Sequence, residues 1–352
     1  MRFWQPAASA ARAATKGFDA GSDRARGGET SDSFLGQELS DRVEADAPGR
    51  LVVDENVVAA FERDETRAGD AGGDLAALPR GESFDFVDRM AARVPAEMIA
   101  SILGLPTAEV PYFAGRVYQL ARAVQPIYPH ADHEDIEAAA AELFDYVEAH
   151  MRARMATPRD DLLSTVVASW RSDQAISFES LVLQVLAIVV GGSDTTRAAF
   201  AMLVALLLER PEDWAALQAD PALIPGAVAE GLRYEPSVAS ISRFTKTPIE
   251  IGSAAVPAGV ALSVSTLSAM RDPALYADPD RFDIRRTDHP RLHLVFGMGP
   301  HRCIGEMLAR IELEEGLAAL IEAGLEIEME TRPSMRGFGG IRQITPLQAR
   351  IR

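Results

Sequence analysis

The feature that most constrains the fold is an apolar stretch from residue 181 to 208, interrupted by the polar segment GGSDTTR at 191–197. On either side, LVLQVLAIVV and AAFAMLVALLLE are apolar nearly all round, which is typical of a helix buried on every side. Ser177 is suited to cap its start. The stretch is long enough to cross a bilayer, but an aspartate and an arginine near the bilayer centre would be very costly. We therefore expect a soluble central helix.

Composition and charge narrow the class of protein. A chain of 352 residues with 47% hydrophobic and 25% charged residues has the composition of a globular protein with a large core. The net charge of −17 argues against nucleic acid and membrane as partners, because both attract cations. A single cysteine, Cys303, allows no intramolecular disulfide, and the N-terminus lacks the apolar segment of a secretory signal. We expect a cytoplasmic protein.

The pattern along the chain predicts two regions. Residues 1–80 are rich in Ala, Gly, Asp, Arg and Ser, and we expect them to be loop-rich. Residues 81–352 begin with helical patterns and continue with short β-prone segments, of which LEIEME at 325–330 alternates apolar and acidic residues like a half-exposed strand. The predicted fold class is mainly α with small β-sheets (α+β), the sheets lying toward the C-terminal half.

The segment FGMGPHRCIG, from Phe296 to Gly305, carries the strongest chemical signal. Gly297, Gly299 and Gly305 allow a tight backbone that can approach a flat ligand closely. Cys303 precedes a helix, whose N-terminal dipole favours a thiolate. Such a thiolate is a nucleophile or a metal ligand, and metal ligation is favoured because no histidine base with a clear local signature accompanies it. The alternative is an inert buried cysteine.

Two further motifs are informative in this company. Gly191 and Gly192 each cost about 1 kcal/mol against alanine in a helix interior, and close approach of a ligand would explain them. The alternative is an irregular polar helix crossing. In EGLR, Glu230 and Arg233 are three residues apart and share one helix face, although such a pair alone is usually an exposed ion pair.

The segment FGMGPHRCIGEMLAR resembles the haem-binding loop of the cytochromes P-450 in their soluble bacterial form. The resemblance implies a cytochrome P-450-like haem domain at 81–352 with heme b (iron protoporphyrin IX) as cofactor. Cys303 would be the proximal thiolate ligand of the iron. Phe296 would shield the sulfur, and His301 and Arg243 would bind the haem propionates.

The same resemblance extends to the other motifs. Glu230 and Arg233, with Arg281 of DPDRF as the third member, would form an ion-pair network that braces the haem loop. Asp194 and Thr195 would deliver protons to iron-bound dioxygen. PSVASIS and GGIRQITPLQ match regions that line the substrate pocket, which makes Ile241, Ile344 and Thr345 weak candidates for substrate contacts.

The implied function is that of a haem-thiolate monooxygenase. It would insert one oxygen atom of O2 into a small organic substrate by hydroxylation or epoxidation, with ferredoxin and ferredoxin reductase as electron donors. One alternative is a cytochrome P-450-like auxiliary or interaction protein without oxidase activity, and another is a peroxide-driven enzyme. The substrate and oligomeric state stay open.

Residues 1–80 depart from the family pattern, so the N-terminal part of the fold is expected to be incomplete. The expected propionate-binding helix, with a His and an Arg four residues apart, is absent from this part of the sequence. Fewer cationic partners for the propionates imply a haem that is lost more easily. Four histidines, His130, His133, His150 and His289, are expected at the surface or in loops, and His293 matches no motif position.

Overall fold

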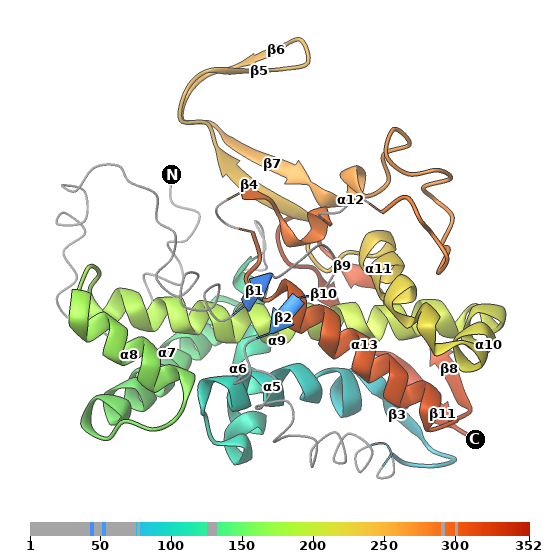
Figure 1. The fold of residues 1–352 in the computed structure, drawn as a ribbon, viewed down its shortest axis with the longest axis horizontal. Helices are drawn as coiled ribbons and strands as arrows, with labels where there is room; N and C mark the ends of the chain where they lie inside the picture. The colour runs from blue at the N-terminus through green and yellow to red at the C-terminus, as the bar shows by residue number, and fades with distance from the viewer. Residues whose placement is uncertain are drawn as a thin grey trace.

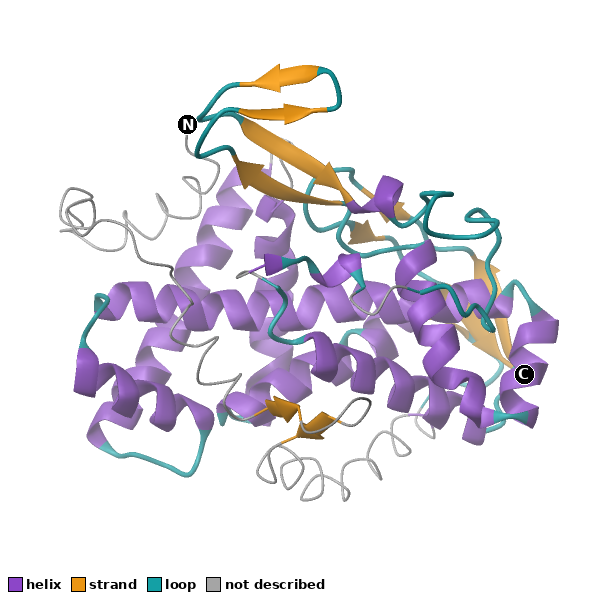
Figure 2. Cartoon of the chain, turned by 45° about the horizontal axis from the view of Figure 1, so that its top comes forward, coloured by secondary structure: helices purple, strands orange, loops and turns teal. Residues whose placement is uncertain are grey.

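The computed structural model describes residues 43–45, 51–53, 75, 78–124, 132–289, 293–299 and 302–352. Within these ranges the protein is built mainly of helices with small sheets, as predicted (Figures 1 and 2). The longer helices are α5 (Arg93–Leu103), α6 (Val110–Ala121), α7 (His133–Ala156), α8 (Leu162–Asp173), α9 (Phe178–Leu208), α10 (Pro211–Ala219), α11 (Ile224–Tyr234) and α13 (Glu306–Glu322). Short helical turns occur at η2 (Val87–Ala91), α12 (Thr266–Ala269) and η7 (Leu294–Phe296).

Helix α9 runs through the middle of the molecule (Figure 1). It begins as predicted at Ser177, whose Oγ accepts a hydrogen bond from the N–H of Ser180 at 3.1 Å. The helix is long and apolar enough to cross a membrane. Most of its residues are nevertheless buried against other helices, which is the placement expected of a core helix.

Two apolar clusters share α9. Its first half packs with α5, α6, α7 and α8, and its second half packs with α10, α11, α13 and the C-terminal strands. The central polar segment therefore lies where the two clusters meet. This position lets residues 191–197 face several different elements.

The sheets are small and antiparallel, and they pair segments that are far apart in the sequence. The three-stranded sheet has the order β3 (Ser83–Asp85), β11 (Gln348–Ile351), β8 (Ile327–Thr331). The two-stranded pairs are β1 (Val43–Ala45) with β2 (Leu51–Val53), β4 (Ser240–Phe244) with β7 (Ala261–Ser265), β5 (Ile249–Ile251) with β6 (Ala254–Val256), and β9 (Met335–Arg336) with β10 (Gln343–Ile344). Pairs β4–β7 and β5–β6 project from the helical body (Figures 1 and 2).

The predicted strand at 325–330 is confirmed by β8, in which Ile327 and Met329 are half-buried while the glutamates are exposed. Most of residues 1–80 lie outside the described residues, so the boundary between 1–80 and 81–352 stays a prediction.

Candidate active site

One stripe of α9 is open although the helix is otherwise largely buried. Ala187 and Gly191 are exposed and Thr195 is half-exposed, and their spacing of four residues puts them on one helix face. A Cβ added at Gly191 would meet nothing within 4 Å. The chain itself therefore leaves room beside the middle of α9, which suits a ligand that approaches the backbone.

Gly192 is needed for a different reason. A Cβ at this position would clash with Cδ1 of Ile99 on α5. The close packing of α5 on α9 explains this glycine without a ligand. Approach of a ligand to Gly192 stays a prediction, while for Gly191 the open space agrees with the explanation by ligand approach.

Thr195 and Asp194 point to different surroundings although they are adjacent in the sequence. The hydroxyl of Thr195 donates a hydrogen bond to the carbonyl of Gly191 at 2.7 Å, on the open stripe. Asp194 is completely buried and forms an ion pair with Arg197. Its Oδ2 also accepts a hydrogen bond from Nε2 of Gln343 at 3.3 Å.

Asp194 therefore has no direct contact with solvent, and its part in proton delivery stays a prediction. Burial raises the pKa of Asp194, and Arg197 and Gln343 lower it without cancelling that effect. Neither partner was predicted from the sequence. Arg197 could have been found from its i,i+3 spacing to Asp194, whereas no local signal pointed to Gln343.

The loop from Phe296 to Gly305 folds back on itself around Cys303. The N–H of Cys303 donates to the carbonyl of Phe296 at 2.8 Å, and Arg302 donates from Nη1 to the carbonyl of Gly297 at 2.6 Å. Gly297 and Gly299 have φ values of 75° and 78°, which side chains rarely adopt. Two of the three predicted glycines thus have a conformational role.

The surface of this loop is apolar and open. Cys303 is exposed, and so are its neighbours Met298 and Ile304. Although the residue as a whole is exposed, the protein around its sulfur removes enough water to raise the pKa of the thiol, with the nearby Glu306 raising it further. The N–H of Gly305 and the charge of Arg302 lower the pKa, but by less. The backbone at the start of α13 thus favours the thiolate, as expected, but in the chain without a metal this effect is smaller than that of burial.

Arg243 reaches the same loop from β4. Its Nη2 donates to the carbonyl of Met298 at 3.3 Å. A guanidinium held beside an open loop can bind a carboxylate. His301, the other predicted propionate ligand, lies outside the described residues.

The three candidates for substrate contacts have different surroundings. Ile344 packs against the apolar core, and Oγ1 of Thr345 accepts from the N–H of Ser334 at 2.8 Å. Ile241 is half-buried on β4. Their contact with substrate stays a prediction.

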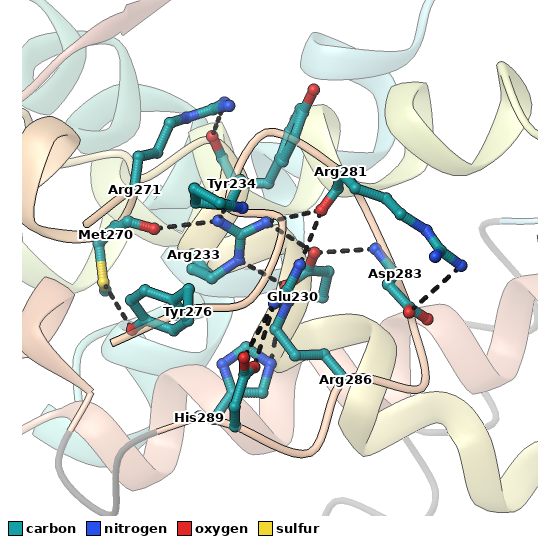
Figure 3. A network of polar contacts seen from close by, with 12 residues as sticks. Glu230, Arg233, Tyr234, Met270, Arg271, Tyr276, Arg281, Asp283, Arg286 and His289 are labelled. Atoms are coloured by element: carbon teal, nitrogen blue, oxygen red, sulfur yellow. Dashed lines mark hydrogen bonds and ion pairs between the residues drawn. The ribbon is translucent and has the colours of Figure 1, made fainter. Parts of the chain in front are cut away.

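Glu230 and Arg233 form a buried ion pair on α11 (Figure 3). The Arg233 Nε and Nη2 lie 2.7 and 2.8 Å from the two carboxylate oxygens, and neither side chain is accessible to solvent. The remaining donors of Arg233 bind the carbonyls of Met270, Pro279 and Arg281 at 2.7–3.0 Å. The pair therefore ties α11 to the irregular segment that precedes the cysteine loop.

The third member of this network is Arg286, not the predicted Arg281. Arg286 places its Nε 3.1 Å from Oε2 of Glu230 and is buried. The side chain of Arg281 is 69% exposed and lies 3.5 Å from Asp283, so Arg281 takes part only through its carbonyl oxygen. The physical reason is that Asp283 bonds Glu230 through its N–H at 2.8 Å, and the chain then brings Arg286 inward.

A row of rings connects this network with the cysteine loop. The ring centroids of Tyr276, His289, His293 and Phe296 follow one another at 6.2, 5.6 and 6.3 Å. His289 lies in a loop, as expected, and its ring is also 3.7 Å from Oε2 of Glu230. Burial lowers the pKa of His289 and lowers that of His293 to about 3.

Comparison with known proteins places these features in a family. The sequence model of cytochrome P450 matches residues 109–336, which is more than half of the chain. The chain belongs to the cytochrome P450 family. The resemblance seen in the sequence is thereby confirmed.

Among relatives, the plant-inducible cytochrome P450-pinF1 of Rhizobium radiobacter is 38% identical over 275 residues, which cover 78% of this chain and 65% of that protein. Nocardicin C N-oxygenase of Nocardia uniformis subsp. tsuyamanensis is 37% identical over 243 residues, which cover 68% of this chain and 59% of that protein. The chain thus spans somewhat less than two thirds of the length of these two cytochrome P450 relatives.

The solved structures agree on the fold. The crystal structure of Mycobacterium smegmatis CYP164A2 with econazole bound superimposes with a TM-score of 0.78 at 25% identity, covering 97% of this chain and 83% of that chain. The predicted cytochrome P450 fold is thereby confirmed.

The residues present fit the haem that the family implies. In the described residues no group of three or more His, Cys, Asp or Glu side chains could hold a metal ion. A single exposed thiol therefore suits a metal whose other ligands come from a macrocycle. The open stripe at Gly191, the apolar surface at Met298 and Ile304, and the guanidinium of Arg243 suit the face and a carboxylate of such a group.

Proposed function

We propose that this cytochrome P450 chain is a haem-thiolate monooxygenase that acts on a small organic substrate. The observation that carries the proposal is that α9 has an open stripe ending at Thr195 and that α13, which follows the Cys303 loop, packs on the same helix. Heme b would be the cofactor, held by Cys303 through iron and by Arg243 and His301 through the propionates. Gly191, Phe296, Gly297, Gly299 and Gly305 would surround it.

When bound, such a centre supplies reductive cleavage of O2 and transfer of one oxygen atom to a C–H or C=C bond. The raised thiol pKa of Cys303 means that the chain alone does not stabilise the thiolate, so metal ligation would displace the thiol proton. The side chains of the protein would hold the cofactor, exclude water and move protons.

Thr195 is suited to proton handling at the open stripe. While its hydroxyl donates to the carbonyl of Gly191, its lone pairs can accept a hydrogen bond from water or a ligand. To donate a proton toward the site, the hydroxyl must leave that carbonyl. Asp194, held by Arg197 and Gln343, would supply protons from the buried side of the helix.

The electron donors would be a ferredoxin and its reductase, and the protein would act in the cytoplasm. The reaction on substrate would be hydroxylation or epoxidation. Nocardicin C N-oxygenase, one of the relatives, is by name an oxygenase, which supports oxygen transfer as the reaction class.

The proposal is tested by the absorption spectrum of the purified protein, reduced and exposed to carbon monoxide. A haem-thiolate centre gives a Soret band at long wavelength, whereas an auxiliary protein without haem gives none. Cys303→Ser should abolish this band, because the chain has no second cysteine and a neutral hydroxyl is a poor iron ligand. A Cys303→Ser protein that kept the thiolate band would refute the assignment.

Haem anchoring is tested separately by transfer of haem to apomyoglobin. Arg243→Ala should speed the transfer, because a propionate loses its cationic partner. Arg332→Ala is a matched control, since Arg332 pairs with Glu209 at the surface. Equal transfer rates in both variants would remove Arg243 from the haem site.

A further inference from the structure

Both carboxylate oxygens of Asp194 have a partner. Oδ1 is paired with Arg197, and Oδ2 accepts from Nε2 of Gln343 at 3.3 Å. The residue is fully buried. Within the described residues these two contacts therefore take the place that hydrogen bonds to water would have at the surface.

The two contacts differ in what they fix. Arg197 lies one turn further along the same helix, so its ion pair with Asp194 is formed within α9. Gln343 comes from β10, and its hydrogen bond joins Asp194 directly to another element. Within the described part of the chain, Gln343 is thus the direct partner that Asp194 has outside its own helix.

The backbone that carries Gln343 is itself firmly held. The neighbouring Arg342 donates to the carbonyl of Met335 at 3.0 Å and to Glu235 at 2.7 Å, and its N–H donates to the carbonyl of Ser237 at 2.8 Å. An amide side chain on such a support can impose a position on the carboxylate. It need not follow the movement of α9.

Arg197 is also held from outside α9. Its guanidinium stacks over the ring of Tyr118 on α6, 3.8 Å from the ring centroid. Tyr118 in turn donates from its hydroxyl to the carbonyl of Ala92 at 2.8 Å. The ionisable groups around the pair are thus Tyr118 on α6, Asp85 at the end of β3, which interacts with Arg197, and Asp88 on η2, which interacts with Tyr118.

A glutamine is chemically suited to a carboxyl group that changes its protonation state. Its NH2 group donates to an ionised carboxylate, and after rotation of the amide its oxygen accepts from the protonated acid. A methionine or leucine could do neither, and a glutamate would add a second negative charge. The amide therefore offers a partner to both forms of Asp194.

We propose that Gln343 is a positioning residue for Asp194, which fixes the orientation of the carboxyl group and sets the pH at which it takes up a proton. The inference rests on the proposed function insofar as Asp194 supplies protons to the haem site. Gln343 acts through Asp194 and does not itself contact the reacting atoms.

The experiment follows the C=O stretch of protonated Asp194 by infrared difference spectroscopy of the full-length, haem-containing protein between about pH 5 and 9. Asp194→Asn identifies the band by removing it. Gln343→Met should move the midpoint of the titration upward by about one to two pH units, the equivalent of one hydrogen bond to a charged group. Gln343→Glu should move it at least as far upward, because like charges disfavour ionisation.

The matched control is Gln348→Met, a glutamine on β11 whose Oε1 accepts from Ser83 at 3.4 Å. It should leave the titration of Asp194 in place. A Gln343→Met midpoint equal to that of the wild type would overturn the proposal, and so would the absence of any titrating band that Asp194→Asn removes. If Gln343→Met does not fold, the same comparison is made with Gln343→Glu.

A second readout separates this inference from the proposed function. The pH profile of product formation per electron consumed should shift upward in Gln343→Met together with the infrared midpoint. A carbon monoxide spectrum without the thiolate band would refute the monooxygenase assignment, while the infrared titration would still decide the role of Gln343.

Discussion

The guanidinium of Arg286 lies 3.1 Å from the carboxylate of Glu230, in a place where both side chains are buried. Arg286 thereby shares Glu230 with Arg233 and also binds the carbonyls of Ala277, Asp278 and Arg281. One glutamate thus organises two arginines that together hold the segment leading to the cysteine loop. Loss of either arginine leaves part of a buried negative charge unpaired.

Arg286→Met should lower the free energy of unfolding by about 3 kcal/mol or more, because breaking a buried ion pair leaves its partner uncompensated. Arg281→Met is the control, and its effect should stay within about 0.5 kcal/mol since that side chain is largely exposed. Urea denaturation of both variants measures the difference. Equal losses in the free energy of unfolding of the two variants would show that the side chain of Arg281 belongs to the network.

The two glycines of α9 should respond in opposite directions. Gly192→Ala should destabilise the protein by about 1–3 kcal/mol, because the new methyl group meets Ile99. Gly191→Ala should stabilise the chain by up to about 1 kcal/mol, since alanine is the better helix former and its Cβ meets open space. Thermal unfolding compares them, and a destabilising Gly191→Ala would contradict the open stripe.

Glu312 on α13 should make stability depend on pH in the neutral range. Burial raises the pKa of this carboxyl group to about 8, and its Oε1 has no hydrogen-bond partner in the described residues. Between the unfolded value of 4.5 and about 8 the folded state binds more protons, so stability falls as the pH rises. Glu312→Gln should remove this slope, which reaches at most about 1.4 kcal/mol per pH unit.

The matched control for Glu312 is Glu315→Gln, which replaces an exposed glutamate on the same helix and should retain the slope. Urea titrations at several pH values between 5 and about 8 give both profiles. If wild type and Glu312→Gln were parallel over this range, the buried carboxyl group would not titrate as described.

His293 should make the stability of the protein depend on pH in the acidic range. Burial, with smaller contributions from Arg310 and His289, lowers its pKa from 6.5 to about 3. The unfolded state therefore binds a proton that the folded state excludes, and stability falls as the pH drops below 6.5 toward about 3. His293→Gln should flatten this part of the profile, which urea titrations at several pH values between about 3 and 6.5 measure. A variant whose profile runs parallel to that of the wild type would contradict this assignment.

The hydroxyl of Thr195 should govern the yield of product. Thr195→Ala should leave the carbon monoxide spectrum intact but lower product formed per electron consumed by about tenfold or more, equivalent to about 1.4 kcal/mol in the partition. Thr195→Ser, which keeps the hydroxyl, should restore most of the coupling. Equal coupling in all three proteins would exclude Thr195 from proton delivery.

The sequence was most informative where local rules decide the structure. The Ser177 cap, the buried α9, the β8 alternation and the Glu230–Arg233 pair all follow from spacing along one element. Contacts between distant segments could not be predicted, because nothing in the sequence near Gln343 or Arg286 indicates which carboxylate each side chain contacts. The packing of Ile99 against Gly192 could not be predicted for the same reason, since Ile99 lies 93 positions earlier in the sequence.

Strand β11 lies between β3 and β8, with Ala349 opposite Phe84 on one side and Met329 on the other. The sheet therefore cannot close during synthesis until residues 348–351 have left the ribosome, long after β3 has emerged. Until then, β3 and β8 expose unpaired backbone groups. We expect closure of this sheet to be a late step in the folding of a newly made chain, whereas the helices between β3 and β8 can form earlier.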